Sequence, residues 1–190
     1  GVFSRTWAQT LVNAVTPEWT HLNDAELTSQ LQQLRKSYQP LPPGQEMAWN
    51  VKTKLMTEGS CATLLAATVT AMADGVLLEA LAIGDCCLLV LRGDGSLACS
   101  FPLVSATDFN TSPVLVRSLY QPQPAYRRLA PVRLGIGDLL LVCTDAVGKW
   151  ALECVEAQMT HLLTDALFSL VASETLDSPT ALSPPIEAAT

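Results

Sequence analysis

The stretch Gly137-Asp138-Leu139-Leu140-Leu141-Val142-Cys143-Thr144-Asp145 is an apolar run that ends in an acid, and residues 77–85 follow the same pattern, ending Ile83-Gly84-Asp85. Apolar runs of this length, rich in Leu and β-branched residues, predict buried strands. A carboxylate at the end of such a strand lies half in the core and half in a cleft. When ionised there, it needs a cation, hydrogen-bond donors or a metal. Asp85 and Asp145 therefore make a divalent-cation site the first functional hypothesis.

Further strands are expected around these two runs, at residues 60–72, 77–83, 87–92, 96–101, 132–134 and 138–144. The joins Ala73-Asp74-Gly75 and Arg92-Gly93-Asp94-Gly95 carry the Asp-Gly signal of a β-hairpin. A third turn is expected at Gly135-Ile136-Gly137, pairing the last two strands. Such short joins favour antiparallel neighbours. Residues 102–129 are predicted to form a long loop, which in a compact domain is often functional.

Helical periodicity flanks the strands on both sides of the sequence. Before them we expect helices over residues 4–15, 24–38 (capped by Asn23) and 45–57, and after them helices over residues 147–152 and 155–173. The sum is an α+β fold in one domain, residues 1–176. Residues 177–190 are rich in Pro, Ser, Thr and Ala, which predicts a flexible C-terminal tail.

Composition narrows the function classes. A net charge of −7 argues against a nucleic-acid partner, because phosphate contacts need clustered Lys and Arg. The densest basic spot, Arg127-Arg128, is interpreted as solvated surface in preference to a contact with a phosphorylated substrate. No apolar run approaches the length of a membrane span, so no membrane partner is expected. Six cysteines without a C-x-x-C spacing are interpreted as reduced, buried thiols, which favours the cytoplasm.

Four motifs occur in order along the chain: Gly59-Ser60-Cys61-Ala62-Thr63-Leu64-Leu65, Ile83-Gly84-Asp85-Cys86-Cys87, Arg92-Gly93-Asp94-Gly95-Ser96-Leu97, and Gly137-Asp138 through Thr144-Asp145-Ala146. Their residues, order and spacing resemble motifs of the metal-dependent PP2C-type Ser/Thr protein phosphatases, most closely the bacterial branch. The chain departs from the family where Cys86-Cys87 replaces Ser-Arg and Ala146 replaces Gly. The resemblance extends from about Gly1 to Ser173.

The resemblance implies an α-β-β-α sandwich of antiparallel sheets flanked by helices, here incomplete because both end strands of the family are missing. It also implies Mg²⁺ or Mn²⁺ as cofactor. Carried over by position, Asp145 would be a ligand of the binuclear centre and Asp85 would serve a third, weaker metal. Gly1 would match the glycine whose carbonyl binds metal, and the family's bridging Asp would precede it.

The function implied is hydrolysis of phosphoserine and phosphothreonine by a metal-activated water, with a phosphoprotein substrate and a cognate Ser/Thr kinase as partners. One alternative is a catalytically inactive pseudophosphatase that binds a kinase or phosphoprotein. Another is a structural α+β domain without metal. Taken alone, an acid after an apolar strand is more often a turn or cap residue, and this interpretation is preferred for Asp138.

Overall fold

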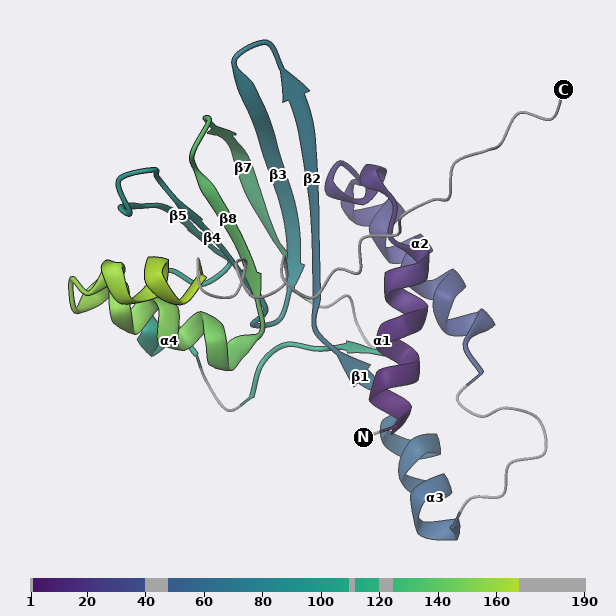
Figure 1. The fold of residues 1–190 in the computed structure, drawn as a ribbon. Coiled ribbons are helices and arrows are strands. Elements are labelled where there is room, and N and C mark those ends of the chain that lie inside the picture. The colour runs from purple at the N-terminus through teal and green to yellow at the C-terminus, as the bar shows by residue number, and fades with distance from the viewer. Residues whose placement is uncertain (1, 40–47, 110–111, 120–124, 168–190) are drawn as a thin grey trace, which may run out of the picture.

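Two three-stranded antiparallel sheets form the centre of the chain (Figure 1). The structure is a computed structural model that describes residues 2–39, 48–109, 112–119 and 125–167. One sheet has the order β2-β3-β7, the other β5-β4-β8, and a separate two-stranded sheet pairs β1 with β6. The strands are β1 (Cys61–Ala62), β2 (Leu64–Met72), β3 (Gly75–Ile83), β4 (Cys87–Leu91), β5 (Leu97–Phe101), β6 (Val116–Arg117), β7 (Arg127–Leu134) and β8 (Leu139–Cys143).

Helices lie on the outer side of each sheet. Figure 1 shows α1 (Val2–Ala14) and α2 (Asp24–Ser37) on one side of the strands and α4 (Asp145–Glu156) on the other. The remaining helical elements are η1 (Pro17–Thr20), α3 (Trp49–Glu58), η2 (Ala106–Asp108) and helical residues 160–167. The α+β class and the antiparallel sheets predicted from the sequence are confirmed.

Three apolar clusters separate these layers, because alternate residues of a strand face opposite sides of its sheet. Between the two sheets lie Leu78, Ala80, Ala82, Leu88, Val90, Phe101 and Leu134. Between α1, η1, α2 and the first sheet lie Trp7, Leu11, Trp19, Leu27, Leu31, Leu64, Leu81 and Ile83. Between the second sheet and α4 lie Cys87, Leu89, Leu91, Ala151, Leu152 and Leu163. The layer order is therefore helices, sheet, sheet, helices.

The predicted start of the second helix is confirmed in detail. The Asn23 side chain accepts hydrogen bonds from the backbone N–H groups of Ala25 and Glu26, and the Glu26 carboxylate accepts one from the Asn23 N–H. This capping box satisfies backbone donors that the first turn of a helix leaves unpaired. The two hairpins with Asp-Gly turns, β2–β3 and β4–β5, are also confirmed.

The hairpin predicted between residues 132–134 and 138–144 is wrong. β7 pairs with β3, and β8 pairs with β4, so the turn at Gly135-Ile136-Gly137 carries the chain from one sheet to the other. Asp138 closes this turn by accepting a hydrogen bond from the Gly135 N–H at 2.9 Å. Its predicted role as a turn residue is thereby confirmed.

Other boundaries differ from the expectation because of tertiary contacts. The strand predicted over residues 60–72 is interrupted at Thr63. Before this residue β1 pairs with β6, and after it β2 pairs with β3. The loop predicted over residues 102–129 holds η2, β6 and the start of β7. The predicted helix 155–173 is replaced by the end of α4 and helical residues 160–167.

Several expectations concern residues outside the described ranges, among them residues 45–47, 168–173 and the predicted tail 177–190. Within the described ranges, no helix is both long enough and apolar enough to cross a bilayer.

Candidate functional site

Asp85 follows β3 at the end of the sandwich. The chain reaches it through Gly84, whose φ of +107° is a conformation that residues with a side chain rarely adopt. A Cβ at Gly84 would lie 2.5 Å from Thr63 Cγ2 and 3.0 Å from the Val114 carbonyl oxygen. The turn is therefore packed tightly against two neighbouring segments, and it holds the Asp85 side chain half-buried.

Asp145 is the first residue of α4 and follows β8 after a single residue, Thr144. Its side chain is exposed. A carboxylate in the first turn of a helix interacts favourably with the helix macrodipole, so this position is favourable for an acid even without a ligand.

The pairing of β4 with β8 brings these two acids to the same end of the sandwich. Cys87 and Cys143 are register partners in this antiparallel pair. Asp85 lies two residues before Cys87, and Asp145 lies two residues after Cys143. In antiparallel strands these offsets point in the same direction, so both acids lie just beyond the end of the same ladder.

The electrostatics agree with this placement. Burial raises the pKa of Asp85, a backbone hydrogen bond lowers it, and the charge of Asp145 raises it further. The two carboxylates therefore lie within electrostatic reach of each other and repel when both are ionised. A cation bound between them would relieve this repulsion.

The thiols beside the acids are poor nucleophiles. Burial raises the pKa of Cys87 to about 12 and that of Cys143 to about 11. The pKa of Cys86 is raised by burial, lowered by its 2.9 Å contact with the Thr63 hydroxyl, and raised by Asp85 and Asp145. All six cysteines lie in the described ranges and none is disulfide-bonded. The prediction of packed thiols fits these protonated side chains.

Asp85 opens into a cleft of about 160 Å³ at the end of the sandwich. Its polar walls are formed by Asp85, Asp108 and Arg127, and its apolar walls include Pro102, Leu103 and Val114. From the sequence, no functional role was predicted for Asp108, and Arg127 was interpreted as solvated surface. Asp108 caps η2, where its carboxylate accepts hydrogen bonds from the Val104 and Ser105 N–H groups at 3.0 Å each.

Arg127 and Arg128 are both exposed, as predicted, and strand alternation sends them to opposite faces of the first sheet. Arg127 is the register partner of Ala82, whose side chain lies between the sheets. Its Nη1 donates to the Pro102 carbonyl oxygen at 2.6 Å, joining β7 to the end of β5. Both arginines retain exposed surface.

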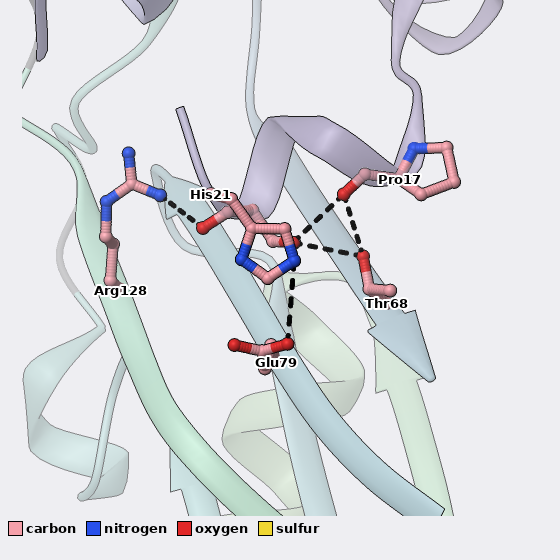
Figure 2. A network of polar contacts seen from close by, with 6 residues as sticks. Pro17, His21, Thr68, Glu79 and Arg128 are labelled. Atoms are coloured by element: carbon pink, nitrogen blue, oxygen red, sulfur yellow. Dashed lines mark hydrogen bonds and ion pairs between the residues drawn. The ribbon is translucent and has the colours of Figure 1, made fainter. Parts of the chain in front are cut away.

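Arg128 serves the helical side of the same sheet. It donates to the carbonyl oxygens of Thr20 and Leu22 and lies over the ring of Tyr126. Figure 2 shows Arg128 in a polar network with Pro17, Thr68, His21 and Glu79. The His21–Glu79 separation is 3.6 Å. This network attaches η1 to the β2-β3-β7 sheet. We therefore infer a structural role for Arg128 and His21.

The donors at this end fit a hard divalent cation. Asp85 and Asp145 offer carboxylate oxygens, the ligands that Mg²⁺ and Mn²⁺ prefer, and Mg²⁺ is commonly held by one or two carboxylates with water in the remaining positions. Across the part of the chain that the structure describes, no group of three or more His, Cys, Asp or Glu side chains is placed to hold a metal. Gly1, the third predicted ligand, lies outside that part.

Comparisons with known proteins find no protein-family model, no curated protein and no solved structure that matches this chain. Function is therefore inferred from the placement of Asp85, Asp145 and the cleft residues.

Proposed function

We propose that this chain is a metal-dependent protein phosphatase domain of the PP2C type, which hydrolyses phosphoserine and phosphothreonine. The observation that carries the proposal is that Asp85 and Asp145 lie at the same end of the sandwich, just beyond the β4–β8 ladder, where Asp85 also lines a cleft. The layer order of helices, sheet, sheet and helices also suits the α-β-β-α sandwich that the sequence motifs imply.

Asp145 and Asp85 are the residues that would hold Mg²⁺ or Mn²⁺, with Gly1 as a further ligand. Bound there, the ions would supply an activated water and offset charge on the phosphoryl oxygens. The chain's own contribution is to position the two carboxylates. Gly84 sets the direction of Asp85, and the first turn of α4 sets that of Asp145. The thiols of Cys86, Cys87 and Cys143 take no part, since none is activated.

The proposal includes a phosphoprotein substrate, a cognate Ser/Thr kinase as partner and a cytoplasmic location. The location rests on the cysteines, because six thiols without a disulfide suit a reducing compartment.

The test is hydrolysis of a phosphoserine peptide by the full-length protein with and without Mn²⁺. We expect turnover that needs Mn²⁺ and that falls by at least about 100-fold in Asp145→Asn, as for loss of a major electrostatic contribution to catalysis. Asp94→Asn is the matched control, because Asp94 is an acid of the β4–β5 turn whose role, accepting from the Ser96 N–H, an amide can fulfil.

Two outcomes would contradict the proposal. Turnover that does not depend on Mn²⁺ and is unchanged in Asp145→Asn would exclude metal-dependent catalysis. Binding of Mn²⁺ and of the phosphopeptide without turnover would assign the chain to the non-catalytic phosphoprotein-binding alternative instead.

A further inference from the structure

Arg127 occupies a position in the cleft that the metal hypothesis does not use. Its register partner Ala82 faces the space between the sheets, so Arg127 enters that space at its open end, where the cleft lies. The charge of Arg127 acts on Asp108, whereas Asp85 responds to burial, its backbone and Asp145. Arg127 and Asp108 therefore lie within electrostatic reach of each other in the same cleft.

The guanidinium of Arg127 differs from those of the other arginines on these sheets. Arg92 is paired with Asp138 and Arg133 with Asp74, while Arg128 is bound to two carbonyl groups and a ring. Arg127 donates to the Pro102 carbonyl through Nη1, and no carboxylate among the described residues lies within ion-pair distance of it. A guanidinium has five N–H donors, and among the described residues the Pro102 carbonyl is the one hydrogen-bond acceptor that Arg127 contacts.

The neighbouring carboxylate of Asp108 is held by the backbone of its own turn. Its Oδ2 atom accepts hydrogen bonds from the backbone N–H groups of Val104 and Ser105, which lower its pKa, with a smaller contribution from Arg127. The remaining walls near Arg127 include Pro102, Leu103 and Pro113, which offer no charge. A guanidinium at a cleft wall favours a planar or tetrahedral oxyanion, which it binds by paired hydrogen bonds.

We propose that Arg127 forms an anion subsite beside the metal end of the cleft, which selects phosphopeptides that carry a second anionic group next to the phosphorylated residue. The subsite rests on the proposed function, since it assumes that the phosphorylated residue itself reaches Asp85 and Asp145. The second group is a carboxylate or a second phosphate, because both present oxygens in the geometry of the guanidinium fork. Arg127 is then a specificity residue.

The experiment compares three phosphoserine peptides that differ at one flanking residue: alanine, glutamate or a second phosphoserine, placed in turn at each position near the phosphoserine. Binding is measured by fluorescence anisotropy on Asp145→Asn, whose turnover should be too slow to deplete the peptide during the measurement, and KM is measured on the wild type. We expect at least one position at which an anionic residue tightens binding about tenfold over alanine, the effect of one charge-assisted contact.

Arg127→Gln should reduce that ratio to about one, and Arg127→Lys, which keeps the charge but not the fork, should retain part of it. Arg133→Gln is the matched control, because Arg133 lies at the other end of β7 outside this cleft, and its ratio should equal that of the wild type. If Arg127→Gln fails to fold because its contact with Pro102 is lost, the Lys variant alone decides.

Equal binding of the three peptides at every position, or a preference that survives both substitutions, would overturn the subsite. Failure of the proposed function looks different. In that case the wild type does not hydrolyse any peptide, while the anisotropy ratios still report whether Arg127 binds an anion.

Discussion

The indole Nε1 of Trp7 donates a hydrogen bond to the Val116 carbonyl oxygen at 2.9 Å, and both residues are fully buried. This bond joins α1 to β6, whose partner β1 leads directly into Thr63. Thr63 in turn contacts Gly84, the residue before Asp85. The first helix is thus connected by two short steps to the segment that positions the candidate site.

Replacing Trp7 with Phe should therefore destabilise the fold. The substitution removes part of a buried ring and leaves the Val116 carbonyl without its donor, so the free energy of unfolding should fall by about 2–4 kcal/mol. Urea denaturation followed by circular dichroism measures the change. Trp49→Phe is the control, because Trp49 is 79% exposed and its loss should cost no more than about 0.5 kcal/mol. Equal effects at the two positions would contradict the assigned burial.

Gly84→Ala tests the turn that directs Asp85. The positive φ and the 2.5 Å approach to Thr63 Cγ2 should together cost about 3 kcal/mol of unfolding free energy. Gly137→Ala separates the two effects, since Gly137 has a φ of +89° but nothing within 4 Å of its added Cβ. It should lose only about 1 kcal/mol. A Gly84 variant as stable as the Gly137 variant would show that the turn is looser than described.

Asp85→Asn should raise the melting temperature at about pH 7 when no divalent cation is present. Burial raises the Asp85 pKa in the folded chain, so the folded state keeps this proton to higher pH than the unfolded state does. The free energy of unfolding consequently falls as the pH rises from the unfolded-state to the folded-state pKa of Asp85. At neutral pH the ionised Asp85 therefore destabilises the fold. The increase in melting temperature of the Asn variant over the wild type should vanish below the ordinary pKa of an Asp.

Thermal melts at about pH 3 and pH 7 measure this difference. A variant less stable than the wild type at neutral pH, without added metal, would mean that Asp85 already has a stabilising partner.

Asp138→Asn should have the opposite pH dependence. The hydrogen bond from the Gly135 N–H, followed by that from Arg92, holds the pKa of Asp138 below its ordinary value. Its stabilising contribution is therefore complete above the ordinary Asp pKa and is lost as the pH falls through the lowered folded-state value. The variant should melt below the wild type at neutral pH, with the gap closing in acid.

Asp74→Asn serves as the control for Asp138. Asp74 pairs with Arg133 across 3.6 Å with both side chains largely exposed, so its removal should leave the melting temperature nearly unchanged. A larger effect at Asp74 than at Asp138 would reverse the order of importance inferred from their surroundings.

Most strands and helices were predictable because their signals are local. Alternation and apolar runs marked β3, β4, β5 and β8, Asp-Gly pairs marked two hairpins, and Asn23 marked the start of α2. The error at β7 and β8 has a clear cause. A short turn predicts neighbouring strands, but it does not reveal whether the chain stays in one sheet or crosses to another when both inner faces are apolar.

The candidate site was predictable in part. The positions of Asp85 and Asp145 after apolar strands could be identified in the sequence, whereas their proximity depends on the pairing of Cys87 with Cys143 across 56 residues. The exposure of Arg127 was predicted, but its place in the cleft wall was not, because adjacent arginines in a sequence look alike. The alternation of a strand over residues 127–134 would have separated it from Arg128, had that strand been predicted to start there.

By itself, the amino-acid sequence determined that β3, β4, β5 and β8 are strands, where two of the hairpins turn and which acids end apolar runs, since each depends on residues within a few positions of one another. Only the tertiary structure decided which strands share a sheet, that Asp85 and Asp145 lie at the same end of the sandwich, and that Arg127 lines the cleft. These features depend on register and layer packing between distant segments, and the free energy that selects them comes from burying apolar faces that no local stretch of sequence contains.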